Sequence, residues 1–312
     1  MEGMFLKFDP GRSAFSITHD DKILFLGSCF SDEIASIAEF SGFHCTSNPF
    51  GTVFHPIPLA RFIKESITGL EQERILERDG RFFSWDASTH LSSPSIKQLE
   101  EQLKNVRQDW LDHLKEASVL FVTFGTAWGY HYQGSMIVAN CHKKPSSEFQ
   151  KDLTEAEVIV ELWNEVLELI KIINPALKVV FTVSPVRHIR DGLIENNQSK
   201  AILLDSIRKI NKSSGSFYFP SYEIVIDQLR DYRFYKQDRV HPSDEAVSVV
   251  WDQFLRFYTS EMTREIVKEI SAFQRFKLHV PRFADEKGIA DYEDRCTKWA
   301  SDLTSKYPNI RV

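Results

Sequence analysis

Three short apolar segments, each followed by glycine or proline, constrain the fold of this 312-residue chain most strongly. They are residues 22–26, 118–124 and 178–184, followed by Gly27-Ser28, Gly125 and Pro185. Apolar runs of this length with such ends are typical of strands buried on both faces of a sheet. Amphipathic segments lie between them, so strand and helix alternate. The alternation predicts right-handed crossovers and a mostly parallel sheet with helices on both faces, an α/β fold.

The other segments show helix and hairpin patterns. Hairpins are expected around Arg78-Asp79-Gly80 and within residues 130–140, and a short strand at 217–219. A capping box of Thr154 and Glu157 predicts the start of a helix that runs to about Ile173. Further helices are expected from Ser31 onward and at 59–67, 96–114, 199–211, 222–229 and 242–257. The chain is therefore predicted as one domain, residues 1–260, with a helical C-terminal extension, residues 261–312.

Charge and cysteine usage narrow the class of partner and the compartment. The formal net charge is −6, which argues against a nucleic-acid partner. No run approaches the roughly 18 apolar residues that span a bilayer, so no membrane partner is expected. The four cysteines are scattered without a C-x-x-C pair, and the N-terminus lacks a secretory pattern. These features predict a reduced, cytoplasmic protein.

Ser28 is the most informative residue of the expected site. In open α/β sheets, ligands bind beyond the carboxyl ends of the strands, and Ser28 lies where a strand turns directly into a helix. There its hydroxyl would stand at the sheet edge, beside N–H groups suited to an oxyanion. Asp238 and His241 offer a carboxylate three residues before an imidazole, in a loop just ahead of a helix. Together the three predict a nucleophile, its base and the acid that orients the base.

Several segments together resemble the GSCFA family. Gly27-Ser28-Cys29-Phe30-Ser31 is similar to the signature in the family's name, with Ser31 where the name has Ala. The similarity extends over about residues 20–260, through NPFG at 48–51, TFGTAW at 123–128, VANCHKKP at 138–145, SPVRH at 184–188, DYRFY at 231–235 and HPS at 241–243. This family looks like a branch of the SGNH, or GDSL-type, hydrolases. The resemblance implies a three-layer α/β/α, flavodoxin-like hydrolase fold.

The resemblance also implies roles for individual residues. Ser28 matches the nucleophile, and Asp238 and His241 match the acid and base. The oxyanion hole would be formed by the N–H groups of Ser28 and Gly51. A further donor, an Asn after Gly125, is replaced here by Thr126, and Asn140 from the inserted hairpin is its expected substitute.

Other interpretations of the same residues remain open. Cys29 is an alternative nucleophile, since a thiol near a helix N-terminus can ionise readily. His131, Cys141, His142 and His188 could suggest a metal, but they lack a closed ligand spacing, so no metal is expected. Aromatic side chains could stack on a sugar or fill the core; these are Trp85, Trp128, Tyr130 and Tyr132.

The preferred hypothesis is a serine esterase that needs no cofactor. It would hydrolyse a small O-acyl ester, such as O-acetyl on a carbohydrate or glycoconjugate, through an acyl-enzyme on Ser28. Trp128, Arg187 and His188 would contact the substrate, although Arg187 and His188 could instead pair with acids of the chain. The alternatives are an O-acyltransferase on the same scaffold and a non-catalytic carbohydrate-binding relative. The sequence makes no prediction of the oligomeric state.

Overall fold

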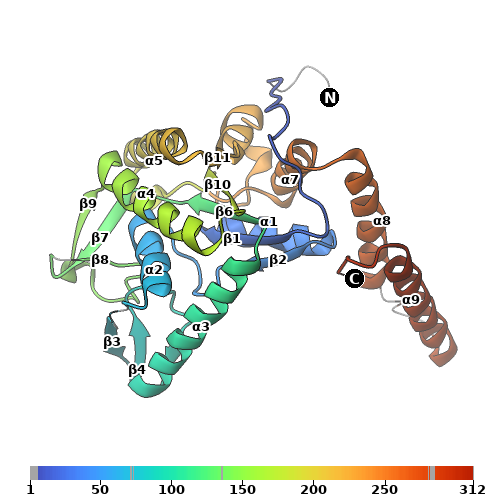
Figure 1. The fold of residues 1–312 in the computed structure, drawn as a ribbon, viewed down its shortest axis with the longest axis horizontal. Coiled ribbons are helices and arrows are strands. Elements are labelled where there is room, and N and C mark those ends of the chain that lie inside the picture. Colours follow the sequence, from blue (N-terminus) through green and yellow to red (C-terminus); the bar gives the residue numbers. More distant parts are fainter. Residues whose placement is uncertain are drawn as a thin grey trace.

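The computed structural model describes residues 6–311 apart from 71, 73, 135, 280 and 282–284. Its central elements alternate as β1 (Lys22–Gly27), α1 (Cys29–Phe40), β2 (His44–Ser47), α2 (Pro56–Thr68), α3 (Ile96–Glu116), β6 (Val119–Phe124), α4 (Ala156–Ile173), β10 (Lys178–Val183), α5 (Leu193–Ser214) and β11 (Phe217–Tyr218). Short helical turns follow, η2 (Ile189–Asp191) lying before α5, and α6 (Ser221–Glu223), η3 (Ile224–Gln228) and η4 (Tyr232–Phe234) after β11. Helices α7 (Asp244–Tyr258), α8 (Glu261–Leu278) and α9 (Glu286–Lys306) complete the chain (Figure 1).

The central sheet confirms the predicted mostly parallel architecture. Its five strands are hydrogen-bonded in the order β11-β10-β6-β1-β2, and every pairing is parallel. Counting only these strands along the chain gives the order 2-1-3-4-5 of flavodoxin-like sheets. In such a sheet the strand order reverses between β1 and β6. The ends of these two strands therefore flank the crevice in which ligands usually bind.

Helices cover both faces of this sheet, as the unbroken apolar runs predict. Ile23, Phe25 and Phe121 point into a core shared with α1 and α7. Their neighbours Leu24 and Val122 point into a second core, shared with α2, α3, α4 and α5. Because side chains alternate along a strand, a run that is apolar at every position has to be covered on both faces.

Two small antiparallel sheets extend the domain beside α2. One joins β3 (Ile75–Arg78), β4 (Arg81–Ser84) and β5 (Ser92–Ser93), and the expected turn has Asp79 and Gly80 in the left-handed region. The other joins β7 (Trp128–Tyr132), β8 (Met136–Ile137) and β9 (Phe149–Leu153). A 3₁₀ turn, η1 (Ser146–Glu148), precedes β9. Both expected hairpins are present, whereas β9 was not predicted.

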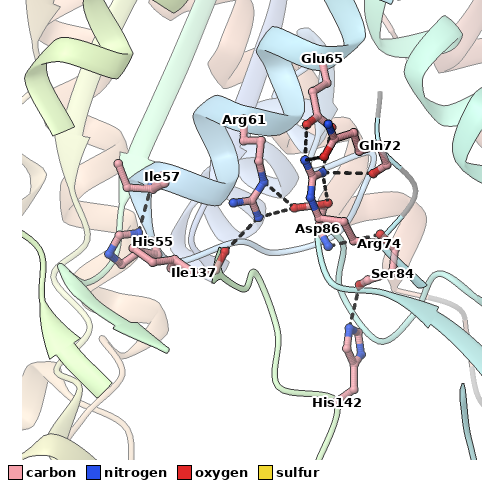
Figure 2. Close-up of polar contacts among 10 residues, drawn as sticks. All are labelled: His55, Ile57, Arg61, Glu65, Gln72, Arg74, Ser84, Asp86, Ile137 and His142. Atoms are coloured by element: carbon pink, nitrogen blue, oxygen red, sulfur yellow. Dashed lines mark hydrogen bonds and ion pairs between the residues drawn. The ribbon is translucent and has the colours of Figure 1, made fainter. Parts of the chain in front are cut away.

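A buried ion cluster ties these sheets to α2 (Figure 2). Asp86, which is 2 % exposed, accepts hydrogen bonds from Arg61 Nε at 2.7 Å and Arg74 Nη1 at 2.9 Å. Arg74 also pairs with Glu65 of α2, and Arg61 Nη2 donates to the Ile137 carbonyl of β8 at 2.9 Å. The carboxylate therefore joins the loop after β4 to α2, and Arg61 extends the link to β8.

The capping box predicted at Thr154 is wrong. Helix α4 begins at Ala156 with Glu155 at its N-cap, and no side chain caps it. The Thr154 hydroxyl instead lies 3.0 Å from Nε2 of the buried His55. That contact orients Thr154 toward the core, away from the first turn of the helix.

The C-terminal region is helical, as predicted. Val267 of α8 packs into the core formed with α1 and α7, while α9 packs on α8 through Trp299 against Phe273 and Phe276. The chain then returns to the sheet, where the Arg311 N–H donates to the Gly42 carbonyl at 3.1 Å. A boundary near residue 260 stays a prediction. No helix in the part of the chain that the structure describes has the length and apolar character needed to span a bilayer.

Candidate functional site

The turn from β1 into α1 places Ser28 at the carboxyl edge of the sheet. Gly27 has φ +114°, and a Cβ there would lie 2.1 Å from the Thr123 carbonyl oxygen, so only glycine lets the two strand ends approach so closely. Ser28 is the N-cap of α1, but its side chain does not cap the helix. Its Oγ is buried and has no hydrogen-bond partner among the described residues. The Ser28 hydroxyl is thus bonded to no described residue, and in this conformation it is closed to solvent.

Asp238 and His241 form the predicted acid–imidazole pair in the loop before α7. Asp238 Oδ2 lies 2.6 Å from His241 Nδ1. Asp238 Oδ1 accepts the N–H groups of Val240 at 2.9 Å and His241 at 3.0 Å. These N–H bonds, together with the imidazole, hold the pKa of Asp238 well below its usual range. The carboxylate stays ionised at neutral pH and orients Nδ1 toward itself, which leaves Nε2 to accept a proton.

The structure does not bring Ser28 and His241 into a hydrogen bond. Ser28 Oγ is enclosed, whereas the His241 side chain is 40 % exposed. The acid–base half of the predicted triad is therefore assembled, and its contact with the nucleophile is not. The assignment of these three residues to catalysis stays a prediction.

The two predicted backbone oxyanion donors are already engaged. The Ser28 N–H continues the ladder between β1 and β6, donating to the Thr123 carbonyl at 3.1 Å. The Gly51 N–H closes a turn onto the Asn48 carbonyl at 2.7 Å. An oxyanion role for either N–H would require release of these bonds, so this part of the site also stays a prediction.

The proposed substitute donor Asn140 lies in the loop after β8, held to neighbouring loop residues. Its Oδ1 accepts the His142 N–H at 2.8 Å and lies 3.3 Å from the Thr89 hydroxyl. His142 in turn bonds the Ser84 carbonyl of β4 at 2.8 Å (Figure 2). Asn140 is therefore anchored to the small β3–β5 sheet.

Trp128 and Arg187, the predicted substrate contacts, bond to neighbours within the chain. Trp128 Nε1 donates to the Glu195 carbonyl at 3.0 Å, and Lys151 Nζ lies 4.4 Å from the centre of its ring. Arg187 donates to the Tyr235 hydroxyl at 2.9 Å and stacks on that ring at 4.3 Å. The alternative that Arg187 pairs with an acid is wrong, because its described partners are a phenol and the carbonyl of Arg239.

Arg187 lines a cavity of about 410 Å³ that reaches Asp238. Residues from the β10 end, α5, the segment 222–232 and the loop before α7 surround it, among them Asn196, Tyr222, Tyr232 and Val240. This hollow adjoins the acid–imidazole pair. Neither Ser28 nor His241 is among the residues that line it.

The sequence also offered an alternative nucleophile, a set of possible metal ligands and aromatic side chains that could stack on a sugar. The Cys29 thiol has its pKa raised by burial and by the carboxylates of Glu33 and Asp32, so it stays protonated at neutral pH, which disfavours it as a nucleophile. His131 of β7 pairs with Asp152 of β9, whereas His142, in the loop after β8, bonds the Ser84 carbonyl of β4. No group of three potential metal ligands gathers within the described ranges. The other aromatics proposed for sugar stacking form a small core with Phe149: Trp85, Tyr130 and Tyr132.

Sequence reasoning missed Lys200, a buried amine at the same edge of the sheet. Its Nζ donates to the carbonyl of Gly125, past β6, at 2.6 Å and to that of Ser184, past β10, at 2.7 Å. Burial lowers the pKa of this amine to about 7. A signal was present, because Lys200 falls on the helical stripe that buries Asn196, Leu203 and Ile207 of α5.

The comparisons with known proteins give a family model and two solved structures that align with the chain. The model of the GSCFA family matches residues 22–254, more than half of the chain. A structure described as a GDSL-like lipase from Parabacteroides merdae aligns with 13% identity over 78% of this chain and 98% of its own, with a TM-score of 0.41. A carbohydrate esterase family 3 structure from Talaromyces cellulolyticus aligns with 8% identity over 81% and 99%, with a TM-score of 0.37. No curated protein matches the chain.

Proposed function

The chain belongs to the GSCFA family, and from that premise we propose that it is a serine esterase acting on a small O-acyl ester through Ser28. The observation that carries the proposal is the 2.6 Å contact of Asp238 Oδ2 with His241 Nδ1. This contact makes Nε2 of His241 the basic nitrogen. This Nε2 lies at the same sheet edge as the Ser28 hydroxyl, which bonds no described residue.

The proposed reaction has two steps. Ser28 Oγ forms a bond to the ester carbonyl carbon while its proton passes to His241 Nε2; the ester C–O bond then breaks, and the alcohol leaves with that proton. Water repeats the sequence on the acyl-enzyme, releasing the carboxylic acid and returning the proton to Ser28. Asp238 stays ionised and stabilises the imidazolium formed in each step.

Because Ser28 is buried, the proposed reaction requires the site to open. An ester can reach Oγ only if the chain around the cavity beside Asp238 moves, bringing His241 to the serine. The substrate class belongs to the proposal too: an acetyl ester of a carbohydrate or glycoconjugate, met in the cytoplasm. No cofactor takes part in the steps as written.

The same burial favours a second candidate, a non-catalytic carbohydrate-binding relative. In it Ser28 would be a small residue that permits the turn after Gly27, and the bonds of the Ser28 and Gly51 N–H groups would be permanent. This candidate predicts saturable sugar binding that Ser28→Ala leaves unchanged.

The test is turnover of p-nitrophenyl acetate and O-acetylated sugars by the wild type, Ser28→Ala and Cys29→Ser. The esterase predicts turnover that Ser28→Ala abolishes and Cys29→Ser retains. Loss in Cys29→Ser alone would move the nucleophile to the neighbouring thiol. No turnover by folded wild type would support the binding protein. Acylation of an added sugar in preference to hydrolysis would identify an acyltransferase.

A further inference from the structure

Two buried polar atoms at the carboxyl edge of the sheet lack hydrogen-bond partners among the described residues. One is Ser28 Oγ, past the end of β1, and the other is His188 Nε2, past the end of β10; β6 lies between these strands. Native proteins rarely leave such atoms unpaired, and a catalytic role is one of the explanations for the exceptions.

The His188 ring is held in place without using Nε2. Its backbone N–H donates to Asn196 Oδ1 at 2.9 Å, and Asn196 is itself buried in α5. The ring meets Phe54 edge to face, with centroids 5.5 Å apart and an interplanar angle of 78°. The backbone bond and the contact with Phe54 both hold His188, and neither uses Nε2, which bonds no described residue.

The surroundings of His188 keep its ring uncharged. Burial is the main cause that lowers the pKa of His188 to about 4, and Lys200 adds to it, against the opposing influence of Asp191. A neutral imidazole carries a single N–H, and in the tautomer with that proton on Nε2 it is a hydrogen-bond donor without net charge.

We propose that His188 is a further catalytic residue, which donates a hydrogen bond from Nε2 to the oxyanion that forms when Ser28 attacks the ester. The inference rests on the proposed function of Ser28. It gives the site a donor that is free in the structure, whereas the N–H groups of Ser28 and Gly51 are engaged by Thr123 and Asn48.

Lys200 is the positioning residue in this arrangement. Its Nζ joins the carbonyls of Gly125 and Ser184 and so fixes the edge from which residues 185–188 continue. Its charge adds to burial, the main cause, in lowering the pKa of His188. The two imidazoles of the site then have separate tasks: His241, paired with Asp238, takes the proton, and His188 donates to the oxygen.

The experiment compares His188→Leu, His188→Gln and Ser28→Ala with the wild type in ester turnover, with folding checked by circular dichroism. Loss of one oxyanion donor lowers kcat by about 10²- to 10³-fold. We expect that loss in His188→Leu with KM little changed, and partial recovery in His188→Gln, whose amide can still donate. A folded His188→Leu with wild-type kcat would overturn the inference. If Ser28→Ala keeps its turnover, the proposed function fails instead.

A second measurement does not depend on these variants folding. Ring ¹⁵N shifts of His188 are followed by NMR from pH 5 to 8 in the wild type, in Lys200→Met and in the wild type carrying a phosphonate on Ser28. We expect no titration of His188 in the wild type over this range, a higher midpoint in Lys200→Met, and a new hydrogen-bonded Nε2–H in the adduct. A His188 that titrates near pH 6.5 in the wild type, or an adduct without that N–H, would contradict the proposal.

Discussion

Replacing Gly51 by alanine tests the packing of the turn that its N–H closes onto the Asn48 carbonyl. Gly51 has φ +79°, and a Cβ there would lie 1.9 Å from Ser88 Oγ and 2.4 Å from Ser88 Cβ. Left-handed backbone costs an L-residue about 1–2 kcal/mol. Ser88 is only 5 % exposed, so it has little room to withdraw, and such overpacking costs about 1–3 kcal/mol more. Gly51→Ala should therefore lower the free energy of unfolding by about 2–5 kcal/mol.

Gly80→Ala is the matched control for this substitution. Gly80 has φ +72° in the β3–β4 turn, and no described atom lies within 4 Å of an added Cβ. Gly80→Ala should lower the free energy of unfolding only by the backbone cost of about 1–2 kcal/mol. Urea unfolding of Gly51→Ala, Ser88→Gly and the double variant completes a double-mutant cycle in which Ser88→Gly should recover about 1–3 kcal/mol. Equal losses in Gly51→Ala and Gly80→Ala, or no recovery in the double variant, would refute the packing argument.

Three further predictions follow from the charged groups. Asp86→Ala leaves Arg61 and Arg74 without their shared buried carboxylate and should cost about 3–5 kcal/mol in urea unfolding, whereas the exposed helical Asp205→Ala should cost about 1 kcal/mol or less. The pKa of Lys200 is about 7 in the folded chain, below its ordinary 10.5, so between these pH values the unfolded chain binds one more proton than the folded chain. The free energy of unfolding of the wild type should therefore rise with pH across that window, by up to about 1.4 kcal/mol per pH unit, and Lys200→Met should lack this rise. A parallel pH profile in the two proteins would contradict the burial of a charge. Asp238→Asn should keep the fold and lower ester turnover by up to about 10⁴-fold, and an unchanged kcat would remove Asp238 from the mechanism.

The periodicity of the chain predicts the layers well and the details of helix ends less well. Apolar runs without polar interruption require helices on both faces, and the order β11-β10-β6-β1-β2 provides them. The cap of α4 could not be predicted, because the Thr154 hydroxyl could bond either the first turn of the helix or another residue. In the structure it contacts the buried imidazole of His55. Local patterns cannot weigh a tertiary contact that comes from a residue about a hundred positions away.

The parts of the candidate site also differ in how well the sequence predicts them. The Asp238–His241 pair is local, three residues apart, and the sequence pattern predicts its contact. The engagement of the Ser28 N–H by Thr123 depends on strand register between β1 and β6, which no pattern near Ser28 contains. Lys200 was missed because a lysine in an amphipathic helix is usually assigned to the solvent side. Its position on the apolar stripe of α5 was the available signal.

Covalent labelling by a fluorophosphonate, read by intact mass and peptide mapping, is the direct test of Ser28 as an activated nucleophile. The experiment compares the wild type with Ser28→Ala and His241→Ala. We expect a single adduct on Ser28 in the wild type, none in Ser28→Ala and a strongly slowed reaction in His241→Ala. A folded wild type that takes up no probe, or takes it up on another residue, would contradict it.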